Sequence, residues 1–274
     1  MKKHLPRILI ALLVIAGIAL LLYPTVSNWL YERNAPKAIQ GYNEAVENLD
    51  EEEIAMQWAM AEKYNAALSG SDIEDPFVPG SGAVLPDNYT MVLDTDDGIM
   101  GYIEIPKIDV YLPIFHGTGE AELQKGAGHI ENTAFPIGGE GNHAVITGHR
   151  AMTKAKMFTD LDKLAEGDVF YVHVLNETLA YQVDQILVVE PEDTTALRPV
   201  SGEDYVSLVT CTPYGINSHR LLIRETHIPY TKEEQEDKDS LPFTINWRIM
   251  IIVVVLVIFG IFWFVMRRKG RRKP

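Results

Sequence analysis

Residues 207–224 read Ser-Leu-Val-Thr-Cys-Thr-Pro-Tyr-Gly-Ile-Asn-Ser-His-Arg-Leu-Leu-Ile-Arg. Apolar and β-branched residues at the two ends of this stretch predict two β-strands, Tyr205–Thr212 and Arg220–Ile228. Pro213 ends the first strand, because proline cannot donate a hydrogen bond to a strand ladder. Cys211 is therefore expected at the end of one strand and Arg220 at the start of the next.

More runs of the same kind precede this pair. They are Met100–Ile105, Ile108–Phe115, Ala144–Gly148, Asp168–Leu175 and Leu179–Glu190. Several short strands divided by turns predict an antiparallel sandwich or a small barrel, so the fold class is mainly β. Short helices are expected at residues 157–164 and 194–197.

The chain before the β-rich domain divides into a stalk and a loop. Residues 28–68 predict a helical stalk, since apolar residues recur at helical spacing and glycine and proline are scarce. Residues 69–97 predict a loop, because glycine, proline and serine dominate much of this stretch. A loop of this length is usually functional or disordered. The β-rich domain then occupies residues 98–230, and an acidic linker follows at 231–244.

Both ends of the chain carry apolar runs with basic neighbours. Within residues 1–27, the run Ile8–Leu22 follows three basic residues and predicts a membrane anchor; a cleaved signal peptide stays open as the alternative. Within residues 245–267, the run Ile249–Met266 has no charge and is long enough to cross a bilayer as a helix. Residues 268–274 form a basic tail. Because basic flanks stay in the cytoplasm, both termini are predicted inside and the β-rich domain outside the cell membrane.

The charge distribution of the chain argues against nucleic acid as a partner. The chain holds 24 basic and 38 acidic residues, for a net charge of −14. Residues 1–26 and 245–274 hold ten of the basic residues and none of the acidic ones. The middle of the chain thus carries 14 basic and 38 acidic residues, a balance that repels nucleic acid.

Cys211 is the single cysteine, which excludes an internal disulfide and a zinc site built on several cysteines. Exported proteins usually pair their thiols or lack them. An unpaired thiol in such a domain is either a reactive group or a small buried apolar side chain, and cysteine counting leaves both open.

Three residues at predicted strand ends have complementary chemistry. Cys211 offers a thiolate nucleophile, and a nearby imidazolium such as His149 lowers the pKa of a thiol and can later protonate a leaving amine. Arg220 offers charged donors to a developing oxyanion. A structural histidine and a surface ion pair remain ordinary alternatives, and neighbouring residues compete for these roles: His143, His219 and Arg150.

Two strings resemble the sortases, a family of cysteine transpeptidases. Thr147-Gly-His-Arg, followed by Lys156-Met-Phe-Thr-Asp-Leu-Asp-Lys-Leu, resembles their histidine segment, and residues 207–224 resemble their Thr-Leu-x-Thr-Cys motif and arginine strand. The similarity covers roughly Gly98 to Ile228, with Ser207 standing where the family usually has threonine. The resemblance implies the eight-stranded sortase β-barrel and no cofactor or metal. It also implies the site residues: catalytic His149, Cys211 and Arg220, and Thr210 as a substrate contact.

The string Cys211-Thr-Pro-Tyr-Gly-Ile-Asn and the C-terminal span look like the pilus-assembling, class C sortases. Asp75-Pro76-Phe77 resembles the lid motif of that class. By this likeness Asp75 would approach Arg220 and Phe77 would cover Cys211, and an ordinary surface loop is the alternative.

The resemblance also implies a reaction and its partners. The enzyme would cleave a Leu-Pro-x-Thr-Gly-like sorting signal of a pilin or surface protein between Thr and Gly, through a thioester on Cys211, and pass the acyl group to a pilin lysine. Three alternatives are a housekeeping sortase that uses cell-wall peptide amines, an L,D-transpeptidase, and a non-catalytic surface scaffold. The L,D-transpeptidase is disfavoured, because no Ser-His-Gly-Cys-like order surrounds Cys211.

Overall fold

The structure, a computed structural model, describes residues 5–68, 73, 75, 77, 88–95, 98–150, 152 and 155–230. The chain divides into two units, Met1–Tyr230 and Thr231–Pro274, and every described residue belongs to the first. The predicted linker 231–244, membrane span 245–267 and basic tail 268–274 lie outside the described residues, as does Pro76 of the lid motif.

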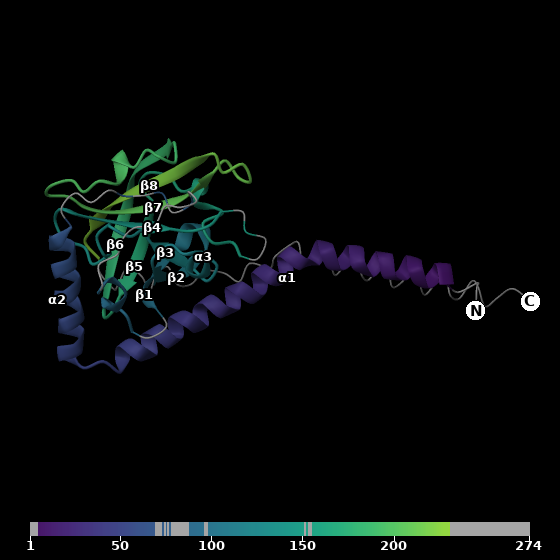
Figure 1. Cartoon of the computed structure of the whole chain (residues 1–274), viewed down its shortest axis with the longest axis horizontal. Helices are drawn as coiled ribbons and strands as arrows, with labels where there is room; N and C mark the ends of the chain where they lie inside the picture. The colour runs from purple at the N-terminus through teal and green to yellow at the C-terminus, as the bar shows by residue number, and fades with distance from the viewer. Residues whose placement is uncertain are drawn as a thin grey trace, which may run out of the picture. The chain divides into compact units, whose positions relative to one another are not determined.

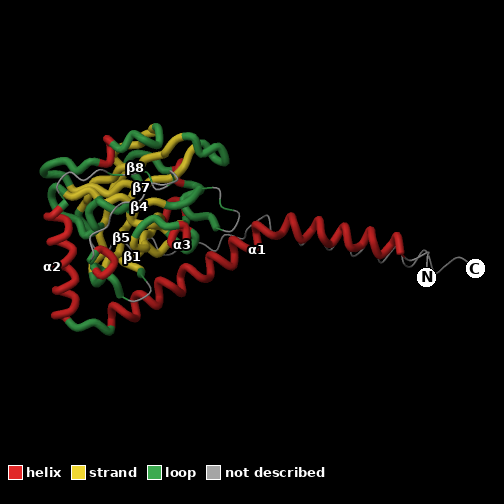
Figure 2. Tube along the Cα trace, in the orientation of Figure 1, coloured by secondary structure: helices red, strands yellow, loops and turns green. Residues whose placement is uncertain are grey.

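In the described part of the chain, eight strands close into a barrel (Figures 1 and 2). They are β1 (Ile99–Ile105), β2 (Val110–His116), β3 (Ala127–His129), β4 (Asn142–Thr147), β5 (Val169–Val174), β6 (Glu177–Val189), β7 (Asp204–Thr212) and β8 (His219–Ile228). Their order around the barrel is β1-β2-β3-β4-β7-β8-β6-β5. This closure confirms the eight-stranded barrel implied by the resemblance and excludes the sandwich.

The barrel departs from the expected antiparallel pattern at two places. β2 pairs with β3 in parallel, and β4 pairs with β7 in parallel. β3 is not among the predicted strands, because it is three residues long and contains no β-branched side chain. The short helix expected over residues 157–164 is confirmed only in part, as a 3-10 helix at Leu161–Lys163. Met157 has a φ of 42°, which no α-helix accommodates, and turns occupy residues 157–160.

The helices lie on the N-terminal side and in the loops. They are α1 (Leu5–Glu47), α2 (Glu51–Ala67) and α3 (Glu120–Leu123), with the 3-10 turns η1 (Tyr89–Met91), η2 (Pro106–Ile108), η3 (Leu161–Lys163) and η4 (Thr195–Leu197). α1 runs without interruption across the predicted boundary between anchor and stalk. Asp50 begins α2 with a capping box, in which it exchanges backbone and side-chain hydrogen bonds with Glu53. Among the residues that the structure describes, none of the helices is both long enough and apolar enough to span a membrane.

Both long helices are attached to the barrel by specific polar contacts. The Tyr42 hydroxyl of α1 donates to the carbonyl of Met100 at 3.2 Å and accepts from the backbone nitrogen of Leu175 at 2.7 Å. Asn65 of α2 donates to the carbonyl of Phe135 at 3.2 Å and accepts from its backbone nitrogen at 2.8 Å. α2 consequently stands along one side of the barrel (Figure 1), and the chain enters the predicted lid loop from a fixed point.

The apolar residues form two clusters on opposite faces of the strands. Alternation along β4, β7 and β8 sends Ile146, Leu208 and Leu221 into the main core. On the outer face of the same strands, Val145, Val209 and Leu222 form a second cluster with Ile130 and Leu197, here called the outer apolar cluster. Ile73, from the predicted lid loop, packs against the outer apolar cluster.

Replacing Asn65 by alanine is expected to lower the free energy of unfolding by about 1–3 kcal/mol, because both backbone groups of Phe135 lose their buried partner. Urea denaturation measures this loss. Asn48→Ala is the matched control, since the Asn48 side chain makes its hydrogen bond to Glu44 at an exposed position. Equal losses from the two substitutions would show that the contact with Phe135 does not hold α2 to the barrel.

Candidate active site

Cys211 and Arg220 face each other on neighbouring strands. The register of β7 and β8 places them directly opposite, so their side chains share one face of the sheet. Cys211 is a free cysteine and is 6% exposed, and the Arg220 side chain is 6% exposed. The guanidinium donates through Nη1 to the carbonyls of Asn217 and His219, which fixes it at the start of β8.

His149 follows the end of β4, and hydrogen bonds tie that end to β7. The backbone nitrogen of Gly148 donates to the carbonyl of Val209 at 3.2 Å, and the Thr210 hydroxyl donates to the carbonyl of Gly148 at 2.7 Å. These bonds hold the residue before His149 against the two residues before Cys211. The sheet therefore brings the three predicted catalytic positions to one end of β4, β7 and β8.

The Thr210 side chain does not lie on the surface where a substrate would contact the protein. Its side chain is fully buried, and its hydroxyl is used within the protein by Gly148. Since Cys211 faces outward, alternation along β7 turns Thr210 toward the barrel interior. The geometry gives Thr210 a positioning role between the ends of β4 and β7 and lends no support to direct contact with substrate.

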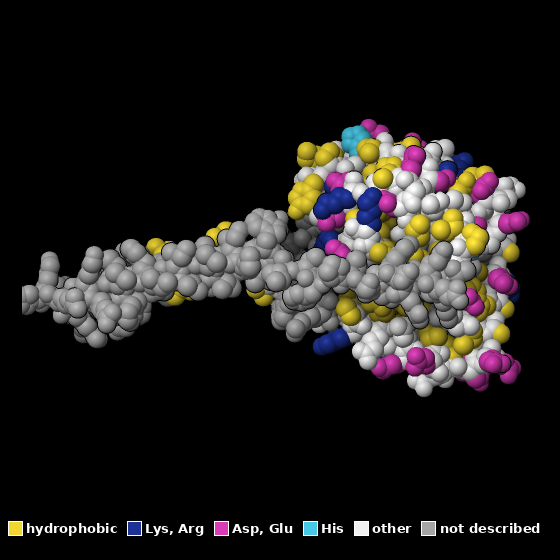
Figure 3. Space-filling view, turned by 180° about the vertical axis from the view of Figure 1, so that it is seen from behind, with side chains coloured by type: hydrophobic (Ala, Val, Ile, Leu, Met, Phe, Trp, Pro, Cys, Tyr) yellow, Lys and Arg dark blue, Asp and Glu magenta, His cyan; other side chains and the backbone are white. Residues whose placement is uncertain are grey.

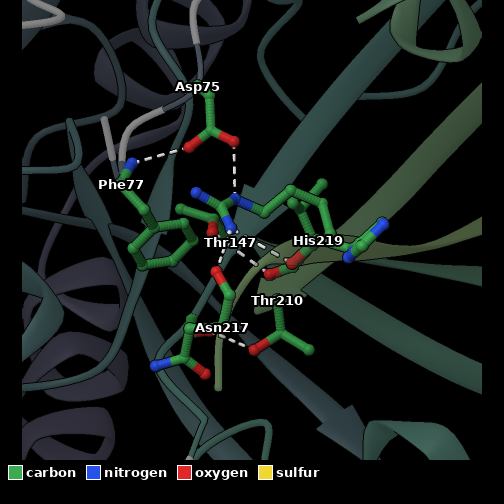
Figure 4. Close-up of polar contacts among 9 residues, drawn as sticks. Asp75, Phe77, Thr147, Thr210, Asn217 and His219 are labelled. Atoms are coloured by element: carbon green, nitrogen blue, oxygen red, sulfur yellow. Dashed lines mark hydrogen bonds and ion pairs between the residues drawn. The ribbon is translucent and has the colours of Figure 1, made fainter. Parts of the chain in front are cut away.

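Asp75 and Phe77 of the predicted lid lie on the site. The Asp75 carboxylate accepts from Nε of Arg220 at 2.5 Å and from the backbone nitrogen of Phe77 at 2.7 Å (Figure 4). Both side chains of the Asp75–Arg220 pair are 6% exposed. The Phe77 ring lies 5.6 Å from the His149 ring and 5.2 Å from the Arg220 guanidinium, measured from the ring centroid. Asp75 therefore approaches Arg220 as expected, while Phe77 lies between the arginine and the histidine.

Asp75 changes the electrostatics of the Cys211 thiol. Burial raises the pKa of Cys211, the Arg220 cation lowers it, and the Asp75 carboxylate raises it again. Asp75 thus cancels part of the benefit that Cys211 draws from Arg220. In this arrangement the thiol is held in its neutral, less nucleophilic form.

The competing candidates have structural partners of their own. Arg150 donates to the Thr159 carbonyl, the Thr212 hydroxyl and the Asp162 carboxylate, so it braces the loop after β4 against the end of β7. His143 is buried, and its two ring nitrogens contact the Ser207 hydroxyl and the Arg198 carbonyl. The His219 imidazole lies on the exposed rim, where its Nε2 is 3.4 Å from a Glu190 carboxylate oxygen.

Glu120 lies near His149 and is not among the site residues predicted from the sequence. Glu120, the first residue of α3, places a carboxylate oxygen 3.5 Å from His149 Nε2, where it restrains the orientation of the imidazole ring. Glu120 lies 29 positions before His149, in a segment without a recognisable motif, so only the fold brings the two together. In the described part of the chain, no three His, Cys, Asp or Glu side chains cluster closely enough to hold a metal ion.

Comparisons with known proteins agree on one family. The family model described as "Sortase domain" matches residues 103–227. The crystal structure of Streptococcus pneumoniae sortase C is 47% identical, with a TM-score of 0.66, over 71% of this chain and 98% of that chain. A pilus-related sortase C of Group B Streptococcus is 42% identical, with the same TM-score of 0.66, over 70% of this chain and 97% of that chain.

Curated relatives match over a shorter stretch. Sortase A of Streptococcus agalactiae is 30% identical over 117 residues, which are 42% of this chain and 47% of the relative. The chain thus spans about half the length of the first curated relatives that it matches.

Asp75→Ala is expected to lower the pKa of the Cys211 thiol, because it removes a nearby negative charge and leaves the Arg220 cation unopposed. The rate of alkylation by iodoacetamide, followed from pH 5 to 10, measures this: the midpoint should move to lower pH, and the rate at pH 7 should rise. Asp184→Ala is the matched control, because it breaks another Asp–Arg pair, with Arg224. An unchanged midpoint in Asp75→Ala would contradict the electrostatic role of Asp75.

Thr210→Val is expected to lower the free energy of unfolding by about 1–3 kcal/mol, because the near-isosteric valine leaves the buried Gly148 carbonyl without its donor. Thr210→Ser keeps the hydroxyl and should retain most of this contact. Amide hydrogen exchange at Gly148 supplies a local readout, which should accelerate in Thr210→Val alone. Equal exchange in both variants would mean that the hydroxyl does not tie β4 to β7.

Proposed function

The chain belongs to the sortase family, and from this premise we propose that it is a class C, pilus-assembling cysteine transpeptidase. One observation carries the proposal. Asp75 pairs with Arg220 and Phe77 packs on His149, so a lid occupies the groove beside Cys211. The likeness to solved structures named sortase C at 42–47% identity supports the same class.

The first half of the reaction makes a thioester. After the lid leaves Arg220, a Leu-Pro-x-Thr-Gly-like signal lies along the groove and the Cys211 thiolate attacks the threonine carbonyl carbon. Arg220 donates to the oxyanion that forms on the carbonyl oxygen. The C–N bond to glycine then breaks, and the His149 imidazolium gives its proton to the departing amine. The acyl group stays on the Cys211 sulfur.

The second half transfers the acyl group to an amine. A lysine side chain of a pilin attacks the thioester carbonyl, and neutral His149 accepts a proton from that nitrogen. The C–S bond breaks, an isopeptide bond forms, and Cys211 leaves as a thiolate. The Cys211–His149 pair thus returns to its starting ionisation, and covalent catalysis divides one difficult exchange into two easier steps.

The proposal includes a location. The apolar runs 8–22 and 249–266 with their basic neighbours support two membrane anchors, with both termini in the cytoplasm. The barrel would then work outside the cell membrane, where surface proteins and pilins are met. The partners proposed are proteins that carry the sorting signal and pilins that supply the acceptor lysine.

The full-length chain carrying Asp75→Ala, incubated with a sorting-signal peptide and no acceptor, is expected to gain the mass of the acyl fragment ending in threonine. Intact-mass spectrometry detects the thioester, and the additional substitution Cys211→Ala should abolish it. His149→Ala should slow its formation about a hundredfold or more, because the leaving amine loses its proton donor.

The native chain, in which Asp75 is intact, is the control that measures the effect of the lid. It should form the thioester adduct more slowly than Asp75→Ala. Equal rates would argue for a housekeeping enzyme without a functional lid. The amine acceptor is then identified by offering pilin and cell-wall peptide side by side. A folded protein that forms no adduct with a panel of signal variants would favour the non-catalytic scaffold.

A further inference from the structure

A cavity with both polar and apolar walls, here called the polar cavity, lies beside the lid and outside the reaction centre. Its volume is ≈ 280 Å³, and its walls come from the end of α2, the segment 132–143 and the connection between β6 and β7. Cys211, His149 and Arg220 do not line this polar cavity. The proposed mechanism therefore leaves it without a role.

The polar cavity continues the groove that starts at Arg220. A smaller cavity beside Arg220 and Asp75 shares Thr194 and Leu197 with it. The apolar walls of that smaller cavity include Val209 and Leu222 of the outer apolar cluster. A peptide that leaves Arg220 along this cluster consequently arrives at the polar cavity.

Three described residues of the lid lie along this path. Ile73 lines the polar cavity, Asp75 contacts Arg220, and Phe77 packs on His149. Two residues of extended chain cover about 7 Å. The polar cavity is therefore within reach of a substrate residue only a few positions from the scissile bond.

The chemistry sets the direction of a bound peptide. His149 protonates the amine of the glycine that leaves, so the C-terminal side of the sorting signal lies toward His149. The N-terminal side must run the other way, past Arg220 and along the outer apolar cluster. The lid has the same direction, with residue 73 at the polar cavity and residue 77 at His149.

The two parts of the groove suit different side chains. The outer apolar cluster suits the leucine and proline of the signal, whereas the walls of the polar cavity include Asn142, whose Nδ2 donates to the Gly138 carbonyl, and the exposed Arg198. Among the described residues that line the polar cavity, Arg198 alone carries a charge at neutral pH, and it is exposed at the rim. The smaller cavity is lined by Asp75, Asp193 and Arg220, so Arg198 is the cation that belongs to the polar cavity itself, while Asp and Glu side chains are spread over the face of the molecule shown in Figure 3.

Arg198 is held by a buried contact. His143 Nδ1 donates to the Arg198 carbonyl at 3.1 Å, and Nε2 accepts from the Ser207 hydroxyl at 2.8 Å. Burial lowers the pKa of His143 to about 4, so the imidazole is neutral and keeps this arrangement at physiological pH. The backbone of Arg198 is thereby fixed to β4 and β7, while its side chain faces solvent.

We propose that the polar cavity is a subsite for the residues that precede the leucine of the sorting signal, and that Arg198 makes it prefer an upstream segment carrying Asp or Glu. This inference rests on the proposed function and adds to it a specificity determinant beyond the sorting signal. The recognising chemistry is a carboxylate on an extended polypeptide segment against the Arg198 guanidinium.

The test uses the full-length chain carrying Asp75→Ala and three peptides with one Leu-Pro-x-Thr-Gly-Gly core. The core is preceded by an acetyl group, by Glu-Glu or by Lys-Lys, and kcat/KM is measured from release of the C-terminal fragment. The kcat/KM of the Glu-Glu peptide should exceed that of the Lys-Lys peptide about two- to fivefold, the range expected for a partly exposed ion pair. The ratio should shrink in 0.5 M salt, because salt screens such pairs.

Arg198→Glu should invert the ratio of the two charged peptides, and Arg198→Ala should bring it close to one. Lys37→Glu is the matched control, since Lys37 is exposed on α1, lines neither cavity, and undergoes the same change of charge. The effect should fall on KM. A merely structural role of Arg198 would instead lower kcat for all three peptides alike.

Equal kcat/KM for the three peptides, with the core still cleaved, overturns the subsite and leaves the proposed function standing. A preference for Glu-Glu that survives Arg198→Glu overturns the role of Arg198. Failure to cleave any of the peptides overturns the proposed function, and this inference with it.

Discussion

The register of β7 between β4 and β8 is the constraint on which the candidate site depends. Side chains alternate along a strand, so Cys211 and Val209 face outward while Thr210 and Leu208 face the core. Pairing with β8 then sets Arg220 opposite Cys211, and pairing with β4 delivers His149 to the same end. A slip of one residue would turn Cys211 into the barrel and expose Thr210. The packing of the barrel core thus fixes the positions of the reactive side chains on the outer face of the barrel.

In the proposed function, the lid acts on this arrangement through the charge of Asp75 as well as by covering it. Asp75 is buried against Arg220, and burying an ion pair carries a desolvation penalty that offsets much of the attraction. The pair by itself therefore does not strongly favour closure. The packing of Ile73 on the outer apolar cluster and the cation–π contact of Phe77 with Arg220 add to its stability. While the lid is closed, the cation that lowers the pKa of Cys211 is partly neutralised. Access and thiol reactivity are consequently controlled by the same few residues.

The sequence predicts most strands, because runs such as 205–212 and 220–228 are β-branched and bounded by turn residues. It does not predict the parallel pairing of β4 with β7, since local periodicity carries no information about which strands become neighbours. Cys211, His149 and Arg220 could be selected as strand-end residues, and the resemblance singled them out. The inward position of Thr210 also follows from alternation once Cys211 is placed outward. Glu120 and the polar cavity arise from segments distant in sequence, so they are visible only in the folded chain.

The shared path of lid and substrate connects specificity to opening. A peptide binds only the open state, so its apparent dissociation constant exceeds the intrinsic one by the inverse of the open fraction. Contacts in the polar cavity strengthen binding to that open state, and a bound upstream segment competes with Ile73 for its place at the cavity. A protein substrate with a suitable upstream segment therefore shifts the lid equilibrium further than a short core peptide does. In this scheme the closed lid raises the apparent dissociation constant of every substrate by the same factor, so discrimination between substrates comes from the contacts in the polar cavity.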